Sequence, residues 1–468
     1  MIANPGSGTL GHAANVARFK TDRAGRTRSV RAAHIEAMWD LLRALLYGIV
    51  LTRASCDLAF DWISGGGGAM GVGAIVNALA IAIAFSLLAR RPLTAPFAIF
   101  AIWGPLLLTA LIATLRAPDF SAAARMAMGL LSYWSFFAVP FLLWRGPGDV
   151  TRFLFLVIAS SIVPSLYALV DIGRGLSDWS EFRLQSTFAH PNIFAFYLVL
   201  LIGLALYARS SNVIRVAARV KLLITLYVPF LMVLLVLTGT RSAWMACGLI
   251  LLVYAIRIDR RIFAGLLLAP VLFAANPGAY ERLTEFTKAT EVDSLSQLND
   301  STRLNSYVWR TVLWESAVPA ILEKPVLGHG LETFKPSTPR FFPLIGPEGI
   351  DGHNFYLQTS FEMGFTGLFA LLWLLGSVGW QILKARRRDP NGVTIASCIL
   401  IAYALESYSD NMQFYLSFNW CFWFAMGTIC AWVHNGASAP RADGLGYVPQ
   451  PRTSAGVVSP DAFEDKGS

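Results

Sequence analysis

The chain has 468 residues, of which 55% are hydrophobic and only 14% are charged, whereas soluble domains carry roughly 25% charged residues. This composition excludes an ordinary soluble domain and indicates a helical protein that crosses a membrane several times. The net charge of +9 does not indicate a nucleic-acid partner, because the basic residues cluster in alternate short loops, which is typical of membrane topology.

The first 35 residues are polar and basic, and no cleavable signal peptide is visible in them. Because positive residues favour the cytoplasmic side of a membrane, this tail predicts a cytoplasmic N terminus. Its basic residues are Arg18, Lys20, Arg23, Arg26, Arg28 and Arg31.

Apolar segments of near-spanning length predict an all-α polytopic protein with about twelve transmembrane helices. Nine of them fall within residues 36–275 and three within 363–433. The predicted spans are 36–52, 69–89, 95–115, 125–144, 151–171, 192–208, 220–238, 242–256, 261–275, 363–383, 394–409 and 416–433.

Basic clusters mark alternate loops, which are therefore predicted to face the cytoplasm. The opposite loops carry acids and only scattered arginines. An even number of spans returns the tail 434–468 to the cytoplasm, and its richness in Pro, Gly, Ser and Asp predicts disorder. The cytoplasmic clusters are Arg90–Arg91, Arg145 with Arg152, 209–221, 257–261 and 384–388.

Residues 276–362 form a predicted periplasmic loop that is too long for a bare connection. Apolar spacing from Arg303 to Glu323 predicts a helix, which Pro319 kinks or splits, and 299–302 offers N-caps. Four prolines after Pro325 predict an irregular chain until Gly352.

Three arginines and one histidine, from four separate segments, are predicted to share the periplasmic face. Arginine beside lipid is costly, and several converging arginines favour an anionic, phosphate-bearing substrate. Histidine is the best available base near neutral pH. These residues are Arg183, Arg241, Arg310 and His353. Taken singly, each also fits an ordinary solvated or snorkelling side chain.

Other polar residues near these positions have supporting roles in this interpretation. Asn192 fits a helix cap, His190 an interfacial histidine, and Asn354 or Glu362 a partner for His353. Glu332 and Asp351 are weaker candidates. Neither the histidines nor the five cysteines show metal-ligand spacing, so we expect no metal and no other cofactor.

Taken together, these motifs resemble the O-antigen ligase and polymerase superfamily of bacterial envelope glycosyltransferases. The resemblance runs from Arg183 to Ala370. It rests on Arg183 with Phe188-Ala189-His190-Pro191-Asn192, Thr238-Gly239-Thr240-Arg241-Ser242-Ala243, Arg310-Thr311-Val312-Leu313-Trp314, Glu323-Lys324-Pro325-Val326-Leu327-Gly328-His329-Gly330, and His353-Asn354-Phe355-Tyr356-Leu357 with Glu362-Met363-Gly364.

The resemblance implies a GT-C-like fold in the bacterial inner membrane and a glycan donor on undecaprenyl pyrophosphate. The matching arginines would hold the pyrophosphate, and His353 would activate the acceptor hydroxyl. Two positions depart from the family pattern. Thr240 stands where Ser is common before Arg241, and Arg303 is a second basic residue near Arg310.

The preferred hypothesis is a polymerase of exopolysaccharide or O-antigen repeat units, whose acceptor is a growing glycan. The alternative within the superfamily is a ligase that moves glycan to lipid A core. A lipid-linked sugar flippase is a more distant alternative, because transporters place charged sites near the bilayer midplane. Other polysaccharide export or assembly proteins are possible partners.

Overall fold

The computed structural model describes residues 36–59, 72–90, 96–175, 183–263, 306–342 and 346–437. Within these ranges the protein is all-helical, which confirms the predicted fold class. A helix over residues 36–53 is followed by α3 (Val72–Arg90), α4 (Ala98–Arg116), α5 (Phe120–Leu142), α6 (Gly148–Ala159), α7 (Ile162–Gly175), α8 (Pro191–Ser210), α9 (Ala218–Leu237), α10 (Arg241–Arg257), α14 (Ser306–Glu323), α15 (Phe334–Phe341), α16 (Phe355–Leu383), α17 (Pro390–Ser409), the 3-10 turn η3 (Met412–Phe414) and α18 (Leu416–Ala437).

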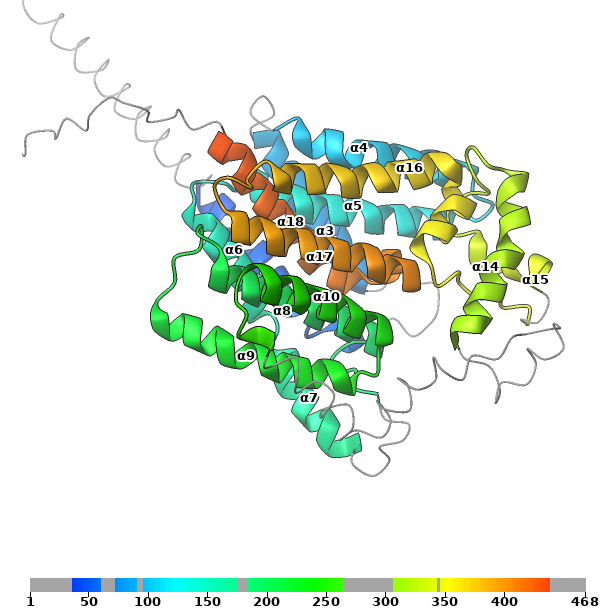
Figure 1. The fold of residues 1–468 in the computed structure, drawn as a ribbon. Helices are drawn as coiled ribbons and strands as arrows, with labels where there is room; N and C mark the ends of the chain where they lie inside the picture. Colours follow the sequence, from blue (N-terminus) through cyan, green and yellow to red (C-terminus); the bar gives the residue numbers. More distant parts are fainter. Residues whose placement is uncertain are drawn as a thin grey trace, which may run out of the picture.

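Most of the long helices lie roughly along a common direction, and α14 and α15 cover one end of the bundle (Figure 1). Among the described residues, eight helical segments are long and apolar enough to cross a membrane. They correspond to α3, α4, α6 with α7, α8, α9, α16, α17 and α18. The predicted total of twelve spans remains a prediction, and the predicted span 261–275 lies almost entirely outside the described residues.

The core of the bundle is built around α8 and α18, in which almost every residue is buried. A helix that is apolar on all sides can be buried on all sides. In α3 and α9, by contrast, only 28% of the spanning segment is buried. Aromatic rings fill the centre: the ring centroids of Trp103 and Trp423 lie 4.7 Å apart. This packing fixes the ends of the central helices, from which the candidate residues project.

One predicted span, 151–171, is broken into α6 and α7 at Ser160 and Ser161. Pro164 has no backbone N–H to donate to the carbonyl of Ser160, so a continuous helix would lose that bond. The chain restarts instead with Pro164 in the first turn of α7, where no donor is needed. The Ser160 hydroxyl at this break donates to Val157 O at 2.7 Å and lies 2.6 Å from Tyr197 Oη.

The long loop differs from its prediction in two respects. Helix α14 runs without a break through Pro319, so the proline does not split it. The irregular chain expected after Pro325 contains the short helix α15, because Pro336 lies in its first turn, where the N–H groups have no helical acceptor. The proposed caps at 299–302 and Arg303 lie outside the described residues.

A kink in α16 anchors the loop to the bundle. Gly364 has φ 68° and ψ −171°, which interrupts the helix and exposes its backbone groups. The segment 325–330 bonds to this kink: Gly330 N donates to Glu362 O at 2.9 Å, and Phe365 N donates to Pro325 O at 2.7 Å. A Cβ on Gly328 would collide with the backbone of Glu362. Backbone hydrogen bonds therefore join two separate sequence motifs, the segment 325–330 and the kink at Gly364.

Candidate functional site

The structure brings Arg183, Arg241, Arg310 and His353 to the same end of the bundle. Arg183 precedes α8, Arg241 is the first residue of α10, Arg310 lies on α14, and His353 lies just before α16. All four side chains are partly exposed, so a substrate can approach them. Two residues, Asn192 and Asp410, connect Arg183 to His353.

Asn192 joins the first two arginine-bearing segments. The guanidinium of Arg183 donates from NH2 to Asn192 Oδ1 at 2.8 Å and to Thr240 Oγ1 at 3.2 Å, and from Nε to Thr238 O at 3.0 Å. Thr240 Oγ1 also donates to Asn192 Oδ1 at 3.1 Å. We call this set of bonded residues, Arg183, Asn192, Thr238 and Thr240, the arginine hub. Because Thr240 directly precedes Arg241, the arginine hub fixes the start of α10 relative to the start of α8.

The helix cap of α8 differs from the prediction. His190, not Asn192, caps the helix, because the Asn192 backbone N–H donates to His190 Nδ1 at 3.1 Å. Pro191 follows at the first helical position, where its fixed φ suits a helix start. The Asn192 side chain is thereby left for the arginine hub. Loss of hydration and the positive charge of Arg183 lower the pKa of His190, which favours a neutral ring.

Asp410 links this hub to the histidine. Asn192 Nδ2 donates to Asp410 Oδ2 at 2.6 Å, and His353 Nδ1 lies 3.5 Å from Asp410 Oδ1. Asp410 follows the last residue of α17 and is only 2% exposed. Burial alone would raise the pKa of its carboxyl, but His353, Asn192 and the charge of Arg310 outweigh burial and lower it to about 2. The carboxylate is therefore charged at every physiological pH.

The backbone of His353 is held in an unusual conformation. Its φ is +46°, in the left-handed region that non-glycine residues rarely adopt. Both neighbours are fixed: Gly352 N donates to Gln358 Oε1 at 3.1 Å, and Asn354 N donates to Asn411 Oδ1 at 2.9 Å. Such a conformation persists only where its surroundings enforce it, so the direction of the imidazole is set before any substrate binds.

Arg310 joins α14 to the end of α17. Its NH1 donates to Ser409 O at 2.7 Å, at the end of a helix where carbonyl groups lack partners within the helix. Ser409 directly precedes Asp410, so the guanidinium lies close enough to lower the pKa of that carboxyl. One turn further along α14, Trp314 Nε1 donates to Gly352 O at 2.7 Å. The loop helix therefore contacts both sides of the Asp410 and His353 pair.

Arg241 occupies an unusual place for a cation. It is the first residue of α10, beside backbone N–H groups that carry the positive end of the helix dipole. A cation there gains nothing from the helix, whereas an anion would be attracted by both the guanidinium and the N–H groups. Gly239, with φ 65°, makes the turn that brings Arg241 to this position.

The predicted partners of His353 are placed differently from the prediction. Asn354 caps α16 by accepting from Leu357 N at 3.1 Å. Glu362 is buried and accepts from Gln358 Nε2 at 3.0 Å and from Phe334 N at 3.3 Å, so these bonds hold the loop. The carboxylate that reaches the histidine is that of Asp410.

A second support comes from the end of the helix over residues 36–53. Arg53 and Asp57 form a buried ion pair at 3.0 Å, and Asp57 Oδ2 accepts from Ala189 N at 3.3 Å. Thr187 Oγ1 donates to Ala54 O at 2.7 Å. The segment that leads into α8 is therefore held at two positions against this helix end, which steadies the histidine cap and the arginine hub.

The sequence analysis did not find Asp410 or Asn411. Asn411 donates from Nδ2 to Gln358 Oε1 at 2.6 Å, besides accepting from Asn354 N. The available signal was a pair of acids, Glu406 and Asp410, at the predicted periplasmic end of a span. Within the described residues, no group of three or more His, Cys, Asp or Glu could hold a metal ion.

Chemically, the cluster combines a base with fixed positive charge. A proton on His353 Nδ1, facing Asp410, leaves Nε2 free to accept a second proton. The three arginines supply cations on the same end of the bundle, where an anion can form bonds with several N–H groups at once. An Asp–His pair beside arginines is suited to activating a hydroxyl while negative charge develops nearby.

Part of the chain matches a family of known proteins. Residues 225–372 match the family model described as O-antigen ligase. The matched segment contains Arg241, Arg310 and His353, whereas Arg183 and Asp410 lie outside it. No curated protein matches the chain. The resemblance predicted from the motifs is thereby confirmed.

Proposed function

We propose that this membrane protein, in which residues 225–372 form an O-antigen ligase family segment, transfers glycan from a polyprenyl-pyrophosphate carrier to a sugar hydroxyl. The carrier in our proposal is undecaprenyl pyrophosphate, and the reaction takes place at the periplasmic face of the inner membrane. The basic clusters support this orientation, because they would then face the cytoplasm with both termini.

One observation carries the proposal: the buried carboxylate of Asp410 contacts both His353 and Asn192, and Asn192 accepts from Arg183. A base and a cation from distant parts of the chain are thereby held in one network. A solvated loop histidine or a snorkelling arginine needs no such network. The network therefore argues against interpreting His353 and Arg183 as ordinary surface side chains.

In the proposed reaction, the acceptor hydroxyl gives its proton to His353 Nε2 as its oxygen attacks the anomeric carbon of the donor. The bond between that carbon and the pyrophosphate oxygen breaks, and its electron pair leaves with the polyprenyl pyrophosphate. Asp410 stabilises the imidazolium that forms. General-base help of this kind contributes about 10²–10⁴-fold in rate.

The arginines act on the leaving group. Arg241 and the first N–H groups of α10 are placed to attract phosphate oxygens, and Arg310 adds charge from the loop helix. Arg183 donates to Thr238 O, Asn192 Oδ1 and Thr240 Oγ1, which holds its guanidinium beside the start of α10. It both adds to the positive field and positions the residue before Arg241.

The acceptor separates the two family activities. We propose that a growing surface polysaccharide accepts the glycan, which makes the protein a polymerase of exopolysaccharide or O-antigen repeat units. The ligase alternative, with lipid A core as acceptor, is favoured by the description of the matched family. Both activities would use the same donor and the same Asp410 and His353 pair.

Purified full-length protein with lipid-linked repeat units tests the proposal. A ladder of lengthening lipid-linked glycans supports a polymerase, whereas transfer only to added lipid A core supports a ligase. Asp410→Asn should strongly reduce the formation of either product. Reconstitution in liposomes addresses the flippase alternative: movement of the lipid-linked glycan across the bilayer without any new glycosidic bond would contradict both assignments.

A further inference from the structure

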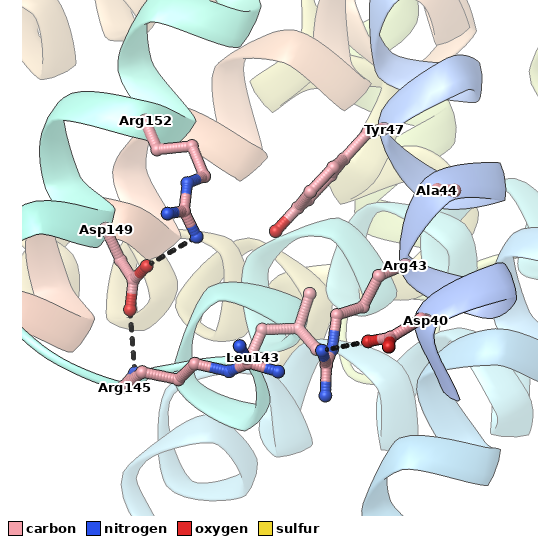
Figure 2. A pocket seen from close by; sticks show the side chains of 8 residues that line it. All are labelled: Asp40, Arg43, Ala44, Tyr47, Leu143, Arg145, Asp149 and Arg152. Atoms are coloured by element: carbon pink, nitrogen blue, oxygen red, sulfur yellow. Dashed lines mark hydrogen bonds and ion pairs between the residues drawn. The ribbon is translucent and has the colours of Figure 1, made fainter. Parts of the chain in front are cut away.

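A cavity of about 230 Å³ lies among three elements, away from the candidate site. It is lined by the helix over residues 36–53, by the connection after α5 and by the start of α6. The lining residues are Asp40, Arg43, Ala44, Tyr47, Leu143, Arg145, Asp149 and Arg152. Figure 2 shows the three arginines and Tyr47 directed into the same space.

This cavity is at the opposite end of the bundle from His353. The loop segment that is anchored at the α16 kink also contacts the end of α4, where Leu331 N donates to Ala113 O at 3.2 Å. Helix α5 starts directly after α4, and its 23 residues carry the chain roughly 35 Å away. The cavity at its far end is on the side predicted to face the cytoplasm.

The acids of the cavity do not neutralise its arginines. Arg43 pairs with the exposed Asp40 at 2.6 Å. Asp149 is shared among three donors: Arg152 NH1 at 3.2 Å, Arg145 N at 2.7 Å and Gly146 N at 3.1 Å. The guanidinium of Arg145 is exposed and has no partner among the described residues. Three arginines against two aspartates leave a net positive charge.

The size of the cavity suits a headgroup. At about 30 Å³ per molecule of liquid water, it holds on the order of seven or eight waters. This space accommodates a phosphate with a small polyol but not a long lipid chain. Beside it, the helix over residues 36–53 exposes Leu41 and Leu45, along which acyl chains can lie.

Membrane topology alone does not account for this arrangement. Basic loop residues are expected on the cytoplasmic side, but they need only reach water. Here Arg43, Arg145 and Arg152 come from three separate elements and converge on one cavity with the Tyr47 hydroxyl (Figure 2). Arginine presents planar pairs of N–H groups that match phosphate oxygens, and basic pockets between membrane helices favour anionic headgroups.

We propose that this cavity binds a phosphate-bearing anion, which is either the headgroup of an anionic phospholipid or a soluble phosphate compound. The shared chemistry is a phosphate held by Arg145 and Arg152, with Arg43 and Tyr47 completing the lining. This site is independent of the proposed glycan transfer, because it shares no residue with the Asp410 and His353 network.

The test uses purified full-length protein in neutral detergent and the double variant Arg145→Gln/Arg152→Gln. Both side chains are exposed, so their loss should not unfold the protein. The matched control is Arg219→Gln/Arg257→Gln, which removes the same charge at the same end of the bundle but outside the cavity. Apparent affinity is measured from the shift of the unfolding midpoint during titration with phosphatidylglycerol, with phosphatidylcholine as the neutral lipid.

We expect wild type and control to bind phosphatidylglycerol in preference to phosphatidylcholine. The double variant should bind it more weakly, by about fivefold for each arginine removed. A second arm compares sodium phosphate with sodium chloride at equal ionic strength. A shift with phosphate that the double variant loses assigns the site to a soluble phosphate compound, and no such shift assigns it to the lipid. The proposal would be overturned by an equal loss in the control, or by a wild type that shows neither a preference for phosphatidylglycerol nor a shift with phosphate.

Discussion

The two ends of the bundle hold their arginines in different ways. At the candidate site, Arg183 and Arg310 are partly buried and donate to oxygens of other helices, and Asp410 is almost fully buried. At the opposite cavity, Arg145 and Arg152 are exposed, and the side chain of Arg152 is 62% accessible. Fixed groups suit catalysis, where geometry must precede the reaction, whereas exposed ones suit an adaptable ligand.

The largest expected effect concerns Asp410. Asp410→Asn keeps the shape but removes the charge that stabilises the imidazolium of His353, so transfer should fall by about 10²–10⁴-fold. The measurement is single-turnover transfer from a lipid-linked donor. Asp389→Asn is the matched control: Asp389 is also buried but caps the other end of α17. Equal loss of turnover per folded molecule in both variants would show that the effect is structural.

Removal of an arginine should have the next largest effect. Arg241→Ala or Arg310→Ala should lower transfer by about 10²–10³-fold, because in the proposed reaction each arginine stabilises the charge of the leaving pyrophosphate. Lysine should restore little of this, since an ammonium does not reproduce the planar pair of N–H donors. Arg257→Ala, at the far end of α10, serves as the control. Full transfer by both alanine variants in the membrane would remove the pyrophosphate-binding role.

A substitution at the loop anchor, where segment 325–330 bonds to the α16 kink, should lower stability rather than the rate of transfer. Gly328→Ala places a Cβ against the backbone of Glu362 at a position with φ 64°, so we expect a loss of about 1–3 kcal/mol. Gly248→Ala, inside α10 with open space around it, should be neutral or stabilising. Thermal unfolding of both variants gives the comparison. Equal stability of the two variants would mean that the contact between Gly328 and the backbone of Glu362 does not stabilise the fold.

A pH-dependent effect is expected at Glu332, on the same loop. Burial, followed by the charge of Asp351, raises the pKa of its carboxyl to about 7. Folding therefore favours the protonated form: this contribution is complete below pH 4.5 and is lost as the pH rises through 7. At pH values above 7, Glu332→Gln should raise the midpoint temperature of unfolding. At pH values below 4.5, it should change that temperature little. An equal effect at both values would contradict the assignment.

The sequence predicted much of the site because arginine near lipid is rare and charge alternation assigns faces. Arg183, Arg241, Arg310 and His353 were placed on one face by this reasoning, and the structure brings them to one end of the bundle. The all-helical class followed from hydropathy in the same way. These inferences depend on residue type and on position along the chain, both of which the sequence contains.

Residue type and position along the chain could not predict contacts between segments that are distant in the sequence. Asp410 looked like one acid among several, because nothing in the sequence shows that the end of α17 meets both Asn192 and His353. The cap of α8 was assigned to Asn192 since asparagine is a common cap, but the arginine hub engages that side chain, and His190 caps instead. The break before α7 was readable from Pro164 and was missed because hydropathy alone runs across it.

The most direct test of the central claim, that His353 is the base held by Asp410, is single-turnover transfer by His353→Ala, measured together with donor binding. His353→Ala should lose most turnover while still binding the lipid-linked donor as wild type does. Near-normal turnover by His353→Ala would contradict the account.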